Sequence, residues 1–205
     1  MDLIPTPPDL VHLPWEPYSP QAVGGLFRSL DGPWWIAGGY ALEAFVGQPF
    51  RAHEDIDVLV LRRDTATLHT VLEGFELWAA DPPGALRRWE SSETLPTRVH
   101  DIWCRVSGTA IWKLQLMVDE VEGEEWVSRR DARMRRPIGR LGWSHDGVRY
   151  LAPEVQLFYK AGSPRDKDER DREKVLPLLG GDARAWLQEA VATVYGRESP
   201  WFGIL

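Results

Sequence analysis

Two short motifs near each other in the chain constrain its fold more than any other feature. The apolar run Trp34-Trp35-Ile36-Ala37 ends in Gly38-Gly39, and the run 53–57 leads into Val58-Leu59-Val60-Leu61. The first run is typical of a short buried strand that turns into a helix at the glycines, because glycine adopts turn conformations that other residues resist. The second predicts a strand over residues 53–61. The core therefore contains a strand, a glycine turn, a helix and a second strand.

The polar side chains of the second motif fall on one face of its predicted strand. Because side chains alternate along a strand, Asp55, Asp57 and His53 point the same way. Two such carboxylates can jointly hold a hard cation, and Mg²⁺ typically combines one or two carboxylates with phosphate oxygens and water. The backbone N–H groups of Gly38 and Gly39 can approach a phosphate closely at the start of a helix. We therefore predict a nucleotide site with Asp55 and Asp57 as metal ligands. His53 either joins this site or has a structural, hydrogen-bonded role.

The rest of the chain predicts further strands and a helical end. Ser19-Pro20 is typical of a helix start, residues 81–96 read as a loop, and residues 99–106 and 111–118 predict a hairpin. Three helices are expected at the end, over Pro153 to Lys160 and after caps at Ser163-Pro164 and Asp182. This order predicts an α/β (α+β) fold with a short mixed sheet, followed by a helical C-terminal part. We place a core domain at residues 1–150 and the helical region at residues 151–205.

Composition argues against several classes of protein. The net charge of −7 argues against a protein that coats nucleic acid without specificity. Cys104 is the only cysteine, so no internal disulfide can form, and its apolar neighbours predict a buried hydrophobic role. No apolar run is long enough to span a bilayer, and Met1 to Pro5 lacks the pattern of a secretion signal. We expect a cytoplasmic protein without a membrane partner.

The segment from Trp35 to Leu61 resembles the signature of the polymerase-β-type nucleotidyltransferase superfamily. It is most similar to the group of aminoglycoside 2''-adenylyltransferases and lincosamide nucleotidyltransferases. The matching residues are Gly38, Gly39, Glu43, Arg51, His53, Asp55 and Asp57. The resemblance implies Mg²⁺-dependent transfer of a nucleoside monophosphate, AMP from ATP in the first instance, to a hydroxyl group with release of pyrophosphate. It also implies a link to antibiotic resistance.

One position departs from that resemblance. The family usually carries a third acidic residue on a later strand, and the matching position in the strand 112–118 is Gln115. An amide can ligate or orient but cannot act as a base at neutral pH. Asp119 has the same strand parity but lies about 13 Å further along the strand, and Asp101 is a more remote candidate base. Either another residue supplies the base, or the metal pair suffices, or the protein binds nucleotide without efficient turnover.

The resemblance also assigns two lysines and leaves the acceptor open. It implies that Lys160 contacts the triphosphate, with Lys167 as the second candidate, while Asp168 and Asp171 anchor helices or pair with arginines. An acidic cluster could attract a polycationic aminoglycoside, and a basic run could hold RNA phosphates. The acidic cluster is Asp119, Glu120, Glu122, Glu124 and Glu125; the basic run is Arg129, Arg130, Arg133, Arg135 and Arg136. The leading hypothesis is transfer to an aminoglycoside-like small molecule; modification of tRNA or protein, and a degenerate nucleotide-binding module, are the alternatives.

Overall fold

The computed structural model describes residues 10–205. The segment Met1 to Pro5, on which the expectation about secretion rests, lies outside the described residues. No helix in the described part of the chain is long and apolar enough to cross a membrane.

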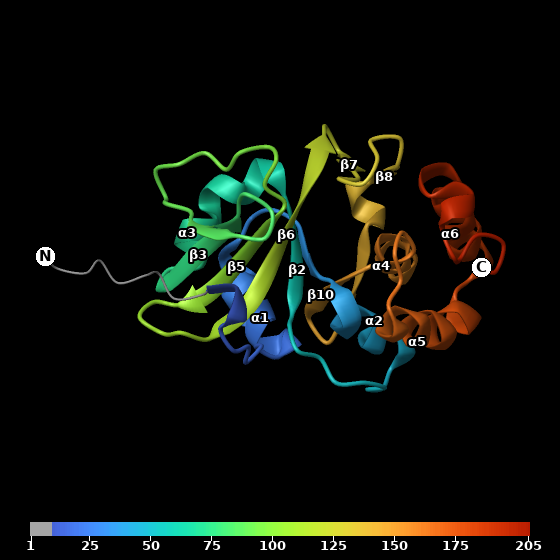
Figure 1. The fold of residues 1–205 in the computed structure, drawn as a ribbon, viewed down its shortest axis with the longest axis horizontal. Coiled ribbons are helices and arrows are strands. Elements are labelled where there is room, and N and C mark those ends of the chain that lie inside the picture. The colour runs from blue at the N-terminus through green and yellow to red at the C-terminus, as the bar shows by residue number, and fades with distance from the viewer. Residues whose placement is uncertain (1–9) are drawn as a thin grey trace, which may run out of the picture.

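A mixed β-sheet runs through the molecule (Figure 1). Its strand order is β4-β3-β5-β6-β2-β1-β10-β9, and β7 joins β6 to β8 at one side. The pairs β1–β10 and β2–β6 are parallel, and the other pairs are antiparallel. The strands are β1 Trp34–Ile36, β2 Asp57–Leu61, β3 Phe75–Ala80, β4 Leu86–Arg88, β5 Asp101–Val106, β6 Trp112–Glu122, β7 Glu125–Val127, β8 Arg135–Pro137, β9 Gly142–His145 and β10 Val148–Leu151. The predicted mixed sheet is confirmed.

Helices cover the sheet and form the C-terminal part of the molecule. Figure 1 shows α1 and α3 near the strands of the first half of the chain, and α2, α4, α5 and α6 grouped on the other side. The helices are α1 Pro20–Leu26, α2 Gly38–Val46, α3 Leu68–Val71, α4 Pro153–Lys160, α5 Asp166–Val175 and α6 Gly181–Val194. Ser19 caps α1 as predicted, because its Oγ accepts a hydrogen bond from the backbone N–H of Ala22 at 3.2 Å.

Both faces of the central strands are buried. Val58 and Val60 of β2 belong to the core beneath α1, whereas Leu59 and Leu61 pack on the opposite face with residues of α4 such as Val155. A strand with both faces covered reads as a continuous apolar run rather than an alternating one. The expected boundary after residue 150 falls inside β10, and α4 shares a hydrophobic core with the sheet.

Three sequence expectations need correction. The strand predicted over 53–61 begins only at Asp57, so Asp55 and His53 lie in the preceding loop and do not share a strand face with it. The loop expected over 81–96 contains β4, which pairs with β3. The helix expected after Ser163-Pro164 begins at Asp166, because Arg165 and Asp168 form its N-terminal cap instead.

Candidate active site

Two carboxylates lie at the floor of a cleft of about 740 Å³ between the sheet and the C-terminal helices. Asp57 is the first residue of β2, and Asp55 lies in the loop just before it; both line the cleft. Neither makes an ion pair or side-chain hydrogen bond with any residue from 10 to 205. Burial and the neighbouring charge of Asp55 raise the pKa of Asp57 to about 7. Two unpaired, mutually repelling carboxylates fit a divalent cation, whose charge would relieve that repulsion.

Gly38 lies directly against this carboxylate pair, at the first turn of α2. Its φ is +65°, and a Cβ built there would come within 2.4 Å of Asp57 Oδ2. The Gly38 N–H donates to Oε1 of Gln156 at 2.7 Å, so that donor is already engaged. The amide of Gly39 is among the first N–H groups of α2, which have no partner within the helix. A phosphate at this helix start would therefore meet Gly39 and the positive end of the helix dipole.

Replacing Gly38 by alanine is expected to weaken ATP-analogue binding at least about tenfold. The methyl group would force a strained positive φ, which costs about 1–2 kcal/mol, and would displace Asp57. Calorimetric titration with a nonhydrolysable ATP analogue and Mg²⁺ measures the effect. Gly25 in α1 is the control, because a Cβ there meets nothing within 4 Å; Gly25→Ala should leave binding unchanged. Equal affinities for the Gly38→Ala variant and the wild type would contradict this account of the glycine.

Arg51 and His53 brace the loop that carries Asp55, rather than lying free in the cleft. Arg51 forms a two-pronged ion pair with Asp171 of α5, at 2.7 Å and 3.0 Å. His53 Nε2 lies 3.0 Å from Glu43 Oε2, and its ring stacks on Tyr40. Burial lowers the pKa of His53 and so favours the neutral ring, although Glu43 acts in the opposite direction. Arg51 also lines the cleft, whereas His53 does not.

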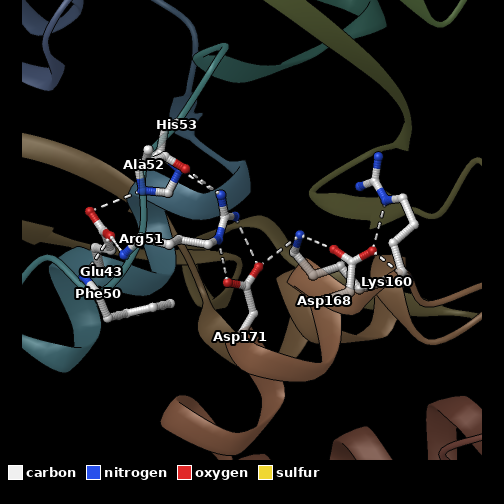
Figure 2. A network of polar contacts seen from close by, with 9 residues as sticks. Glu43, Phe50, Arg51, Ala52, His53, Lys160, Asp168 and Asp171 are labelled. Carbon is white, nitrogen blue, oxygen red and sulfur yellow. Dashed lines mark hydrogen bonds and ion pairs between the residues drawn. The ribbon is translucent and has the colours of Figure 1, made fainter.

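The two lysines that the resemblance assigns to the triphosphate differ in the ion pairs that they make. Lys160, at the end of α4, donates to Asp168 at 2.6 Å and lies 3.0 Å from Asp171 (Figure 2). Figure 2 shows Arg51 and Lys160 meeting at Asp171, which joins the loop before β2 to α4 and α5. Lys167 lines the cleft and has no ion pair within the described chain.

Gln115 occupies the position beside the carboxylates. It aligns with Asp57 across the parallel pair β2–β6, so the two side chains share a face of the sheet. Its Nε2 donates to Asp101 Oδ1 at 3.0 Å, and the same oxygen accepts from Arg129 Nη1 at 3.2 Å. Among residues 10–205, no group of three or more His, Cys, Asp or Glu side chains is arranged to hold a metal. The unpaired carboxylates of the cleft are therefore Asp55 and Asp57, and Asp101 lies one strand further away, outside the cleft lining.

Asp119 cannot replace a third carboxylate in the cleft. It is fully buried, and it accepts hydrogen bonds from Trp126 Nε1 at 2.6 Å and from the hydroxyl of Tyr159. Its Oδ1 lies 3.6 Å from Nε of Arg129. Burial raises the pKa values of both Asp119 and Tyr159. Asp119 thus holds Tyr159 and Arg129, which themselves line the cleft.

Comparison with known proteins places this site in a family. The profile of the aminoglycoside-2''-adenylyltransferase family matches residues 21–175, which include both carboxylates, Gln115 and all of α5. The chain belongs to this family. It is an enzyme of the nucleotidyltransferase class. A search of curated protein sequences found no match.

Two solved structures share the enzyme's fold. The crystal structure of the lincosamide antibiotic adenylyltransferase LnuA, lincomycin-bound, has a TM-score of 0.53 at 14% identity, covering 78% of this chain and 95% of that one. The crystal structure of ANT(2")-Ia in complex with adenylyl-2"-tobramycin has a TM-score of 0.54 at 15% identity, covering 82% and 92% of the two chains. At this level of identity the likeness concerns the fold.

The sequence reasoning missed several residues that line the cleft of the enzyme. Gln156 and Tyr159 come from α4, Arg165 caps α5, and Tyr195 follows α6. Arg129 and Arg130 belong to the basic run, but nothing in that run distinguished them from its other members. Gln156 and Tyr195 have no local signal, since their positions depend on how the helices pack on the sheet.

The acidic cluster and the basic run lie differently around the cleft from what the sequence suggested. None of the acidic cluster lines the cleft, so it does not form the acidic rim that the sequence suggested. Four of its members pair with arginines instead: Asp119 with Arg129, Glu120 with Arg62, Glu122 with Arg135, and Glu124 with Arg63. In the basic run, only Arg129 and Arg130 line the cleft; the others pair with Asp131, Glu122 and Glu154.

Proposed function

We propose that the enzyme transfers a nucleoside monophosphate, AMP from ATP, to a hydroxyl group of a small molecule, with Mg²⁺ held by Asp55 and Asp57. The observation that supports it is the pair of unpaired carboxylates beside the N-terminus of α2, in a cleft that also contains Arg51, Lys160, Arg165 and Lys167. Bound Mg²⁺ supplies charge stabilisation at the phosphates. One of the similar structures holds lincomycin and the other adenylyl-2"-tobramycin, so an antibiotic-like hydroxyl compound is the starting acceptor class.

The residues of the chain have separate tasks in this proposal. Gly39 and the start of α2 hold the triphosphate, assisted by Lys167 and Arg165. Gln115 orients the acceptor hydroxyl, because it aligns with Asp57 and lines the cleft. Asp101 takes the hydroxyl proton, since it is the carboxylate bonded to Gln115 and its side chain is 37% exposed. The base thus lies one strand away from the position that the family resemblance implied.

Replacing Asp101 by asparagine is expected to lower kcat about 10²- to 10⁴-fold, which is the usual contribution of a positioned general base. Asparagine keeps the acceptor oxygen for Gln115 and Arg129 but cannot take a proton. Glutamate at this position should restore part of the rate. Turnover is measured as pyrophosphate release with an acceptor that supports activity. If kcat falls by less than about threefold, Asp101 is not the base, and catalysis depends on the metal pair alone.

Mg²⁺ binding is expected to release protons below about pH 7. Because the pKa of Asp57 is raised to about 7 in the folded protein, this carboxyl is protonated at lower pH and must lose its proton to bind a cation. The apparent Mg²⁺ affinity should therefore increase up to about tenfold per pH unit below pH 7 and level off above it. Calorimetry at pH 6 in two buffers of different ionisation enthalpy measures the released protons. Affinity independent of pH between 5.5 and 8 would contradict this.

Calorimetric binding of a nonhydrolysable ATP analogue tests the function itself. Binding should need Mg²⁺ and should be lost when Asp55 and Asp57 are both replaced by asparagine. Pyrophosphate release from ATP is then assayed with tobramycin, lincomycin and bulk tRNA. Activity that survives the double replacement would refute the mechanism, and turnover on tRNA alone would favour the RNA-modifying alternative.

A further inference from the structure

The cleft is lined by more positive than negative side chains. Its cations are Arg51, Arg129, Arg130, Lys160, Arg165 and Lys167, and its carboxylates are Asp55, Asp57 and Asp168. The triphosphate of the proposed function accounts for part of this excess, since Arg165 and Lys167 are assigned to it. A polycationic acceptor would still need carboxylates in its own part of the cleft, because each ammonium removed from water requires a carboxylate or several hydrogen-bond acceptors. The charge of the lining therefore bears on which acceptor fits.

Each of the three carboxylates already has a task. Asp55 and Asp57 form the proposed metal pair. Asp168 is buried and accepts from Lys160 at 2.6 Å and from Arg165 at 2.9 Å. No carboxylate of the lining is thus left over for an ammonium group. The acidic cluster at the end of β6 supplies none either, because none of its members lines the cleft and four of them pair with arginines.

Two polar groups on the β6 and α6 side of the cleft have no partner. Arg130 follows β7, is exposed in the cleft and makes no ion pair with residues 10–205. The Tyr195 hydroxyl is buried and has no hydrogen-bond partner in the described structure. Arg130 and Tyr195 line the same cleft, so one ligand in it can meet both. Arg129 beside them is occupied, since it binds Asp101 and the carbonyl of His100.

We propose that this is an anion subsite, and that the acceptor is a small hydroxyl compound carrying a carboxylate or phosphate, bound by Arg130 and Tyr195. The inference rests on the proposed function, because it assigns the acceptor of the same reaction. A guanidinium presents a planar fork of N–H donors that matches a carboxylate or phosphate. With its acid group at Arg130, the same molecule would place a hydroxyl beside Gln115 and Asp101. Arg129, the neighbour of Arg130 in the chain, donates a hydrogen bond to Asp101 and so links the two parts of the cleft.

The acceptor is a small molecule rather than a polynucleotide. A nucleic-acid surface needs a run of free cations that follows the phosphate backbone. Outside the cleft, Arg133 pairs with Asp131, Arg135 with Glu122, and Arg136 with Glu154. The cleft of about 740 Å³ must also hold the nucleotide, and pockets of this size suit small ligands.

The test has two titrations on the full chain. The first adds a nonhydrolysable ATP analogue with Mg²⁺. The second adds probes to the saturated complex: glucose 6-phosphate and gluconate as acidic hydroxyl compounds, glucose as their uncharged counterpart, and tobramycin as a polycation. We expect both acidic probes to bind at least about tenfold more tightly than glucose, which corresponds to about 1.4 kcal/mol, and tobramycin to bind most weakly.

Variants assign the subsite to Arg130. Arg130→Gln should lose at least fivefold in affinity for the acidic probes while keeping its affinity for the ATP analogue within twofold. Arg130→Glu should reverse the order of glucose 6-phosphate and tobramycin. Arg140→Gln is the matched control, because Arg140 is exposed and does not line this cleft.

The outcomes separate the two proposals. If the ATP analogue does not bind, the proposed function fails, and the acceptor subsite fails with it. If the analogue binds but tobramycin binds more tightly than the acidic probes, or the acidic probes bind no better than glucose, only the acceptor class is wrong. A loss of ATP-analogue affinity in Arg130→Gln would assign Arg130 to the triphosphate and overturn the subsite.

Discussion

Replacing Asp57 by asparagine is expected to reduce nucleotidyl transfer by at least about a thousandfold, or about 4 kcal/mol in the barrier. Asp57 lies at the cleft floor against Gly38 and aligns with Gln115, so its carboxylate is central to the proposed metal site. Asparagine has nearly the same shape but no charge with which to hold a divalent cation. The measurement is the rate of pyrophosphate release at saturating ATP and Mg²⁺.

The same replacement should leave the fold intact. In the metal-free protein the buried charge of Asp57 is unfavourable, as the raised pKa of its carboxyl shows, and asparagine removes that charge. The thermal midpoint without Mg²⁺ should therefore be equal to or above that of the wild type, while stabilisation by Mg²⁺ should disappear. Asp182→Asn on the exposed start of α6 is the control and should preserve both activity and the response to Mg²⁺. A variant that keeps activity would refute the role of Asp57.

Replacing Asp171 by alanine is expected to lower the free energy of unfolding by about 3–5 kcal/mol, the usual cost of removing one partner of a buried ion pair. The side chain of Asp171 is fully buried and receives Arg51 on one side and Lys160 on the other (Figure 2). Alanine leaves the Arg51 guanidinium, whose side chain is only 12% exposed, without its carboxylate. Lys160 loses less, because Asp168 remains beside it.

Denaturant unfolding measures this effect. Glu173 is the matched control: it is an exposed acidic residue on the same helix, and Glu173→Ala should change stability by less than about 0.5 kcal/mol. Nucleotide binding should weaken as well in Asp171→Ala, because Arg51 fixes the loop that carries Asp55. A loss of stability no greater than in the control would show that solvent already screens the network.

The sequence brought Gly38, Asp55 and Asp57 together because their arrangement is local. The spacing of Gly38-Gly39 and Asp55-x-Asp57 sets a strand, a turn and a returning strand, and the apolar run 58–61 requires burial on both faces. These features depend on periodicity and on the conformational freedom of glycine, which can be read from neighbouring residues. The predicted boundaries were less accurate: His53 and Asp55 lie before β2, since Arg51 and Glu43 hold that loop in place.

The roles of the charged clusters needed the tertiary structure. The acidic cluster and the basic run are adjacent in the chain, and their composition alone left an aminoglycoside and an RNA as possible acceptors. The fold pairs most of their members with each other or with distant residues, such as Glu120 with Arg62, and leaves Arg130 free in the cleft. Which charges stay free depends on strand pairing and helix docking, which no local pattern encodes.

The sequence by itself determined the family, the mixed sheet and the two neighbouring carboxylates that line the cleft, because these follow from short-range pattern and spacing. Only the tertiary structure decided that Gln115 connects the site to Asp101, that Gln156 holds Gly38, and that Asp171 joins Arg51 to Lys160. The physical reason is that each of these contacts joins residues from different elements, and its geometry exists only once strand register and helix packing are fixed.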